Sequence, residues 1–440
     1  MDYLSSNKML IVDLETGETS EDGLDDDLVS QKIGGAGITS SLYETYKDRD
    51  PIILGAGLLT GTLFPASALS VISARSPRAG YLTHSPFTLK AGMELKYTGF
   101  DYVVILGKSE KPVFLWLHDG VADIQDASGL WGKDVWNTTD LLRKSMGDDL
   151  IQTLVIGPAG EDGSDLAQVC VNYWSSGDCW GFGKVFGEKN LKAVALRGMG
   201  LLEISDPEEF VDQCFEILEA IKGSAIEGKR GVEDILTAMG ESDAREWLSP
   251  VVHRHSACYN TPYPTNTFIY LNEDPTTLTE PAEPEPGFMI TDIGAVLALK
   301  KMGFSAVDAG HILRACARRG MDPVPVAEII GKSGQKDPKT IEQSLVGLQG
   351  SVAVPDGANF SSWVPQQPMF GDFGLSGEGS FKDWWMRRQA VAYIFGIHPI
   401  FANMSPELSE EVILEMANKG TGLGLSQETL DQVIADVCSF

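Results

Sequence analysis

The stretch from residue 93 to residue 117 reads MELKYTGFDYVVILGKSEKPVFLWL. It contains two short apolar runs, 102–106 and 113–117, which are separated by glycine, serine and proline. Runs of β-branched and aromatic residues that are bounded by such turn residues are typical of β-strands. The stretch therefore predicts two strands joined by a short loop, in a part of the chain that is mostly β.

Apolar runs of the same kind recur before residue 200, at 9–14, 52–54, 69–74, 153–156 and 190–197. One helix is expected among them, from Thr39 to about Tyr46. The pattern changes at Ser205-Asp206-Pro207-Glu208, where an N-cap candidate precedes proline and an acid, as at a helix start. Helical periodicity follows at 207–222, 231–248, 291–302, 306–319, 323–331, 381–396, 405–418 and 426–437.

We therefore predict an α+β protein, with a β-rich N-terminal domain over residues 1–204 and a mostly α-helical C-terminal region over residues 205–440. The segment EPAEPEPG (280–287) is expected to be an exposed loop. Residues 349–380 are rich in glycine, proline, serine and aromatic residues, which predicts a long ordered loop or a lid. For the aromatic stretch 370–385, packed surface is the alternative to a lid.

Composition and charge exclude several classes of protein. The 440 residues are 43% hydrophobic and 22% charged, which is a globular composition. The net charge of −28, from 62 acidic and 34 basic residues, disfavours nucleic acid and anionic membranes as partners. The most apolar stretch, 51–63, is interrupted by three glycines and predicts no membrane helix. The start MDYLSSNKML lacks the features of a signal peptide, and six scattered cysteines form no disulfide framework, so we expect a cytoplasmic protein.

Two glycine-rich segments are candidates for ligand binding. Gly34-Gly35-Ala36-Gly37 precedes the expected helix, where free N–H groups could bind a phosphate, although a tight turn is the simpler interpretation. The segment 177–183, GDCWGFG, would let the backbone approach a bulky group closely. Its cysteine, Cys179, is either a metal ligand or an inert packed side chain.

The peptide HSACYNTPYPT (255–265) contains Cys258, with Thr261 and Thr265 at the spacing of an iron–sulfur signature, C-x-x-C-x-x-x-C. It is interpreted as a lost metal site, an altered metal site or an ordinary loop. His253 and His255 with Cys258 could supply three ligands to zinc or iron, and an exposed polar loop is the alternative.

The order of several motifs resembles one family. GGAG, LLTGT, RSP, the stretch 93–117, GPAGE and GFGKVFGEKNLKAV follow one another as in the N-terminal half of the aldehyde:ferredoxin oxidoreductase family. These tungsten-pterin enzymes also include a class of benzoyl-CoA reductase subunits. The resemblance is strongest over residues 8–198 and implies a β-rich base for two metallopterin moieties, with helical domains above it.

The resemblance also implies a cluster of four irons and four sulfides, held by C-x-x-C-x-x-x-C and a distant cysteine. Cys258 occupies one of these places, whereas Thr261, Thr265 and His398 occupy the other three. Because hydroxyl oxygen is a poor substitute for thiolate, we expect the 4Fe–4S cluster to be absent. Cys258 and His398, with His255 or His253, are candidate ligands for a single metal ion instead.

The expected pterin contacts also depart from the family. Acids are missing from Lys300–Ser305 and at Tyr393, and Leu69 stands where an arginine is expected. A further expected arginine is replaced within Asp178-Cys179-Trp180. The glycines remain, so a bound cofactor is expected to contact the backbone at Gly35, Gly37, Gly181, Gly183 and Gly303.

Two hypotheses follow from this comparison of residues. In the first, the chain is an oxidoreductase-family subunit that holds a tungsten or molybdenum pterin without a neighbouring cluster. His398, His311 and Cys179 would face the site, with His398 and His311 as candidate catalytic residues. In the second, it is a catalytically inactive paralogue that serves as a structural or regulatory subunit. The chain is also shorter than the family's catalytic subunits. Expected partners are a second copy, or a related or ferredoxin-like subunit in a hetero-oligomer.

Overall fold

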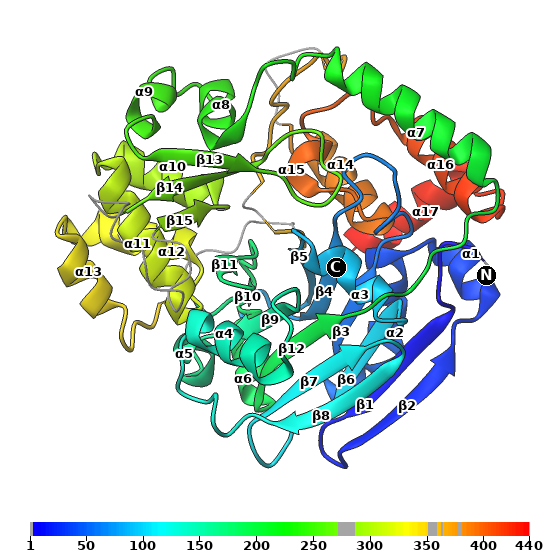
Figure 1. The fold of residues 1–440 in the computed structure, drawn as a ribbon, viewed down its shortest axis with the longest axis horizontal. Coiled ribbons are helices and arrows are strands. Elements are labelled where there is room, and N and C mark those ends of the chain that lie inside the picture. The colour runs from blue at the N-terminus through cyan, green and yellow to red at the C-terminus, as the bar shows by residue number, and fades with distance from the viewer. Residues whose placement is uncertain (1–2, 272–286, 351–358, 362–363, 376–380, 440) are drawn as a thin grey trace.

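The computed structural model describes residues 3–271, 287–350, 359–361, 364–375 and 381–439 (Figure 1). It has the predicted α+β architecture, with a β-rich N-terminal part and a mostly helical C-terminal part. Most of the expected loop at 280–287 lies outside the described residues, as do parts of the expected loop or lid at 349–380. Among the described residues, no helix has both the length and the apolar composition needed to cross a membrane.

Two six-stranded sheets form the N-terminal part (Figure 1). The first has the order β2-β1-β6-β3-β4-β5, and the second has the order β11-β10-β9-β12-β7-β8. The strands of the first sheet are β1 (Lys8–Asp13), β2 (Glu18–Gly23), β3 (Ile52–Ala56), β4 (Ser70–Arg75), β5 (Leu82–Phe87) and β6 (Tyr102–Leu106). Those of the second are β7 (Val113–His118), β8 (Val121–Asp126), β9 (Gln152–Ile156), β10 (Val169–Val171), β11 (Trp174–Ser175) and β12 (Leu191–Arg197).

The stretch 93–117 connects the two sheets. Its first strand, β6, pairs with β1 and β3, whereas its second, β7, pairs with β12 and β8. Alternate residues of β6 face opposite sides: Val103 and Ile105 join a core shared by both sheets, while Val104 faces a second core with Ile38 of α2 (Gly35–Tyr46). Successive side chains of a strand point to opposite faces of the sheet, so an almost wholly apolar strand contributes to a hydrophobic core on each face.

The remaining helices of the N-terminal part lie in the connections between the strands. They are α1 (Asp26–Lys32), α3 (Ala91–Tyr97), α4 (Val135–Met146), α5 (Pro158–Glu161) and α6 (Phe182–Glu188). The helix expected from Thr39 begins earlier, at Gly35, so the GGAG segment forms its first turn rather than a loop before it.

The C-terminal part contains two groups of helices, drawn on opposite sides of Figure 1. One group is α8 (Gly231–Ala238), α9 (Ala244–Leu248), α10 (Ile293–Lys301), α11 (Ala306–Arg319), α12 (Pro323–Ser333) and α13 (Pro338–Ser344). The other is α7 (Pro207–Lys222), α14 (Lys382–Phe395), α15 (Pro399–Ala402), α16 (Glu410–Thr421) and α17 (Gln427–Cys438). Helix α14 packs on α2 and α17, which joins this second group to the first sheet.

Several details of the C-terminal part differ from the sequence prediction, and two of them concern the region before α10. The helix expected over 231–248 is divided, because Gly240 has a left-handed φ of +99° and separates α8 from α9. A three-stranded antiparallel sheet of β13 (Val252–Ser256), β14 (Asn266–Tyr270) and β15 (Gly287–Ile290) was not predicted. Strand β13 reads VHRHS, and none of its residues is fully buried, so it lacks the apolar pattern that identifies strands.

Candidate functional site

The C-terminal end of α14 is attached to the loop that follows β3. Four backbone hydrogen bonds join them. The donors and acceptors are Leu58 to Ile394 (3.2 Å), Leu59 to Phe395 (2.8 Å), Leu69 to Gly396 (2.9 Å) and His398 to Ala66 (2.8 Å). Gly396 has a φ of +88°, which glycine adopts without strain, and it ends the helix. The segment 393–398 is therefore held against the N-terminal base, and His398 is buried at this junction.

The peptide with Cys258 lies at the same junction. Cys258 is 5% exposed, and its sulfur forms a side-chain hydrogen bond with His398. The Thr88 hydroxyl lies 3.7 Å from Sγ, the Asn266 amide nitrogen lies 3.8 Å away, and the Leu89 N–H also donates to the sulfur. Burial raises the pKa of the Cys258 thiol, but His398 and these donors outweigh burial and bring the pKa to about 7.

The other residues that the sequence associated with a metal have different partners. Thr261 donates to the Tyr259 carbonyl at 3.2 Å, and Thr265 is buried with its hydroxyl unbonded. His255 Nε2 lies 2.5 Å from Glu233 Oε1, while His253 stacks on Tyr270 with ring centroids 4.3 Å apart. Within the described ranges, no group of three or more His, Cys, Asp or Glu side chains is arranged to hold a metal ion.

The first two predicted cofactor glycines lie where α2 meets other backbone. A Cβ atom on Gly35 would stand 1.9 Å from the Tyr393 carbonyl oxygen, and one on Gly37 would stand 2.2 Å from the Lys32 carbonyl oxygen. Real Cβ atoms do not approach so closely, so a side chain is excluded at both positions. In this structure the absence of a side chain allows α14 and α1 to pack on α2.

The other three glycines are not gathered with the first two. Gly181 and Gly183 lie against the segment 165–168, with ideal Cβ positions 3.0 Å from the Asp165 carbonyl oxygen and 2.6 Å from the Gln168 carbonyl oxygen. Gly303 lies just beyond the end of α10, and a Cβ there would have no atom closer than 3.6 Å. His311, a candidate catalytic residue, is on α11, where Arg314 donates to its Nδ1 at 3.2 Å.

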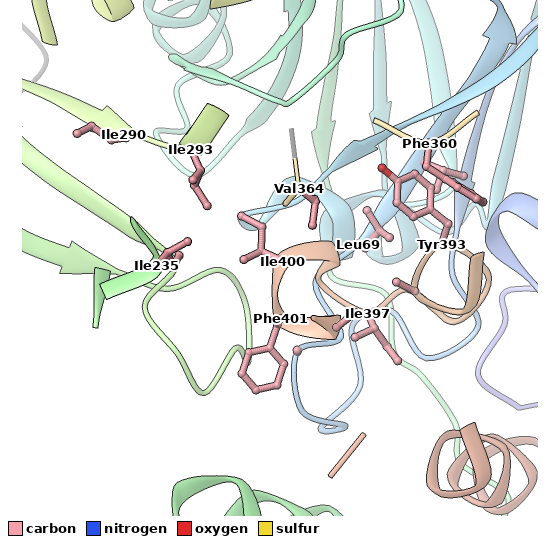
Figure 2. Close-up of a cluster of buried hydrophobic side chains, with 14 of the residues drawn as sticks. Leu69, Ile235, Ile290, Ile293, Phe360, Val364, Tyr393, Ile397, Ile400 and Phe401 are labelled. Carbon is pink, nitrogen blue, oxygen red and sulfur yellow. The ribbon is translucent and has the colours of Figure 1, made fainter. Parts of the chain in front are cut away.

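A group of aromatic side chains fills the junction between the base and α14. Phe360 is stacked on His84, with centroids 5.9 Å apart, and meets Tyr393 edge-on, with centroids 4.9 Å apart. Trp180 Nε1 donates to the His84 carbonyl at 3.0 Å. These four side chains and Leu69 have no exposed surface, and Figure 2 shows Phe360, Tyr393 and Leu69 side by side.

Three buried aspartates form a second feature, between the second sheet and the helices α10 and α12. Arg78 Nη1 lies 3.2 Å from Asp322 Oδ2, and both side chains are less than 10% exposed. Ser175 donates to Asp292, whose other carboxylate oxygen has no hydrogen-bond partner. Asp178 accepts three backbone N–H bonds, from Trp180 (2.9 Å), Val169 (3.0 Å) and Phe182 (3.1 Å).

Burial dominates the electrostatics of these aspartates. It raises the pKa of Asp178 and that of Asp292 to about 6. The pKa of Asp322 rises to about 8, because burial and the neighbouring Asp292 outweigh the effect of Arg78. The sequence analysis did not identify these three aspartates as a group, because they are not distinguishable by pattern among the 62 acidic residues of the chain. Asp292 and Asp322 each stand immediately before a helix. An aspartate at this position is a common N-cap residue, and the sequence pattern does not indicate whether it is buried.

The comparisons with known proteins agree with the resemblance. The aldehyde ferredoxin oxidoreductase N-terminal domain matches residues 9–198. The tungsten-containing aldehyde ferredoxin oxidoreductase of Pyrococcus abyssi is 31% identical over 276 residues, which cover 60% of this chain and 44% of that protein. The aliphatic sulfonate oxidoreductase WOR-like subunit of Pyrococcus furiosus is 29% identical over 231 residues, covering 47% and 37%. The match thus spans less than half of each of these relatives.

A similar fold occurs in a solved structure, the active site complex BamBC of benzoyl coenzyme A reductase with 1,5-dienoyl-CoA. The TM-score is 0.63 at 21% sequence identity, and the superposition covers 95% of this chain and 65% of that one. The similarity therefore extends over both the β-rich and the helical parts, whereas the match to the aldehyde ferredoxin oxidoreductase N-terminal domain is confined to residues 9–198.

Proposed function

We propose that this chain is a non-catalytic member of the aldehyde ferredoxin oxidoreductase family, which acts as a structural or regulatory subunit of a multi-subunit oxidoreductase. One observation carries this proposal. Two positions at which the resemblance expects charged cofactor contacts hold Leu69 and Tyr393, and both side chains are completely buried in protein. Within 178–180, the stretch in which a further arginine is expected, Trp180 is also completely buried.

The packing argues against a metallopterin at this place. Phe360 lies between His84 and Tyr393 and has no exposed surface, so a cofactor there would have to displace it. Burying a phenylalanine side chain stabilises a protein by roughly 1.5–3 kcal/mol, and that stabilisation would be lost. The contact of Tyr393 with Gly35 would also have to open, because the carbonyl of Tyr393 occupies the space beside that glycine.

The charges at the junction argue in the same direction. A pterin cofactor carries phosphate, for which arginine and lysine are the usual partners. Two buried cations of this part of the chain already have partners: Arg78 binds Asp322 and the Cys179 carbonyl, and Lys96 donates to the Leu58 carbonyl at 2.9 Å. Asp178 and Asp292 lie in the same buried group and would repel an anion when ionised. The described residues therefore do not fit a phosphorylated cofactor here.

The donor set beside Cys258 does not fit an iron–sulfur cluster. Of the four positions that the resemblance assigns to ligands, one is a thiol, two are threonines and one is His398. Cubane clusters are held by thiolates, and a neutral hydroxyl is a weak donor. Cys258 and His398 bind each other in this structure, which leaves one donor pair where four ligands are needed.

A role as a subunit is supported by the relatives. One is named a WOR-like subunit, and the similar solved structure is a complex. A chain that keeps the family's scaffold while its cofactor positions are filled could support a related catalytic chain or a ferredoxin-like chain. A second copy of this chain is the simplest alternative partner. The six free cysteines favour a cytoplasmic assembly.

Metal analysis of protein purified without oxygen tests the proposal. We expect tungsten and molybdenum far below one atom per chain, because the junction is packed with side chains. The tungsten-containing relative from Pyrococcus abyssi, expressed in the same host, shows whether that host supplies the cofactor. Tungsten or molybdenum near one atom per chain in this protein, with the relative also loaded, would refute the proposal and support the first hypothesis.

Iron provides a separate test of the Cys258 position. Replacing Cys258 with serine is expected to leave the iron content of the protein unchanged, because a single thiolate does not hold a cluster. Iron and acid-labile sulfide are measured in both proteins after anaerobic purification, and Cys214→Ser serves as a control for loss of a buried cysteine on α7. A loss of iron in the Cys258 variant alone would contradict this expectation.

A further inference from the structure

A cavity of about 790 Å³ opens on the N-terminal base, and none of its lining residues belongs to the junction with α14. Its wall is formed by Glu15, by the segment 49–50, by the loop 107–110 between β6 and β7, and by residues 185 and 188–190 at the end of α6. Ligand pockets in proteins commonly have volumes of about 300–1,000 Å³. The cavity is therefore large enough for a small organic molecule.

The wall of this cavity contains one buried ammonium group, that of Lys189. The residue is 7% exposed, and its Nζ donates to the Gly107 carbonyl at 3.2 Å. Within the residues that the structure describes, no carboxylate lies within 4 Å of this nitrogen. Burial accordingly lowers the pKa of Lys189. An ammonium has three N–H donors and a buried charge is costly without a partner, so Lys189 suits an anionic ligand.

Two further donors lie in the loop between β6 and β7. The hydroxyl of Ser109, which is 9% exposed, accepts from the Lys111 N–H at 3.4 Å, and its own O–H can donate to a ligand. Lys108 is exposed and forms no ion pair with the described part of the chain. Two ammonium groups and a hydroxyl match the three acceptor oxygens and nearly two negative charges of a phosphate monoester.

The rest of the wall is polar and mostly acidic. Glu15 and Glu188 each face a cation, at 3.8 Å and 4.0 Å, whereas Asp50 and Glu110 have no ion-pair partner among the described residues. Ionised carboxylates only accept hydrogen bonds, so they suit the hydroxyl groups of a ligand. Val185 is the one apolar side chain in the lining, and no aromatic side chain is present there. This wall does not suit a nucleobase or an acyl chain.

We propose that the cavity binds a polyhydroxylated phosphate ester, of the class of the sugar phosphates. Lys189, Lys108 and Ser109 bind the phosphate group, and the hydroxyl groups donate to Asp50 and Glu110. The inference stands on the contacts and the lining of this cavity and does not depend on the proposed subunit role. Because the ligand binds the folded chain, it should also raise the melting temperature.

The test is calorimetric titration of the full chain with glucose 6-phosphate, ribose 5-phosphate and glycerol 3-phosphate. At least one of them is expected to bind with a dissociation constant below about 1 mM. Inorganic phosphate should bind at least about tenfold more weakly than that ester, because it has no hydroxyl-bearing carbon chain to reach the carboxylates. No heat of binding with any of the three esters at about 10 mM would overturn the proposal. Equal affinity for inorganic phosphate would do so too.

A pair of lysine variants tests the assigned contacts. Lys189→Gln keeps a donor for the Gly107 carbonyl and removes the charge, so the affinity should fall at least about tenfold. Lys111→Gln, at an exposed position of the same loop outside the lining, should leave it unchanged. If Lys189→Gln melts at a much lower temperature, the exposed Lys108→Gln replaces it, with a several-fold loss expected. Equal affinities for the lining variant and Lys111→Gln would contradict the site.

Discussion

Replacing Asp292 with asparagine is expected to stabilise the protein by about 3 kcal/mol at pH 8 and to change its stability little at pH 4. Asp292 is buried beside Asp322, one of its carboxylate oxygens has no hydrogen-bond partner, and burial raises its pKa to about 6. Above that pH the native protein must hold a charge that burial disfavours. Asparagine keeps an acceptor for Ser175 and removes the charge.

The direction of the pH effect follows from the two states. The pKa of Asp292 is about 6 in the native protein, above the ordinary value of 3.8 that applies to an unfolded chain. The proton is therefore held more tightly in the native state, and its contribution to stability is complete below the unfolded pKa and is lost as the pH rises through about 6. The difference is about two pKa units at about 1.4 kcal/mol each.

The measurement is the melting temperature of both proteins between pH 4 and pH 8. The difference in melting temperature between Asp292→Asn and the natural protein should increase as the pH rises. Other titrating groups are common to both proteins, so their effects cancel in this difference. Because the chain has a net charge of −28, removing any carboxylate relieves some repulsion. Asp212→Asn, at an exposed position on α7, provides that correction. An equal pH dependence for the two variants would show that Asp292 is not held protonated.

The sequence predicted those parts of the fold in which one local pattern decides the structure. The strand pair in 93–117 was identified because β-branched runs between turn residues leave few alternatives, and the pattern holds in β6 and β7. Helix α7 was predicted with its observed bounds, since Asp206 and Pro207 mark its start. Strand β13 was missed because its residues are polar and its position depends on pairing with β14, which no local pattern encodes.

The candidate site was predictable to the extent that it depends on residue identity. That Thr261, Thr265 and His398 stand at the cluster positions of the family was inferred from the resemblance. The contact between Cys258 and His398 could not be inferred, because they lie 140 positions apart in the sequence and the junction of α14 with the base brings them together. Phe360 gave no signal in the sequence, since its effect comes from insertion between His84 and Tyr393.

Replacing Gly35 with alanine is expected to have the largest effect of any single change considered, a loss of more than about 4 kcal/mol and of most soluble protein. Gly35 has a φ of +45°, and a Cβ atom would stand 1.9 Å from the Tyr393 carbonyl oxygen. The overlap is with backbone, so no side chain can turn away to relieve it. Either α2 or the end of α14 would have to move, and the hydrogen bonds from the loop 57–69 to α14 would break.

Two other glycines make this expectation specific. Gly303 also has a left-handed φ, +83°, but open space beside it, so Gly303→Ala should cost only about 1–2 kcal/mol. Gly129 has neither a positive φ nor a close neighbour, and Gly129→Ala should be nearly neutral. Melting temperatures and soluble yields rank the three variants. Gly35 and Gly303 are compared because both were expected to contact a cofactor. An equal loss of stability for the two alanine variants would mean that α14 does not pack tightly on α2. The described packing at the junction would then be wrong. A large effect at Gly35 alone means that this glycine is needed for the helix contact even with no cofactor bound.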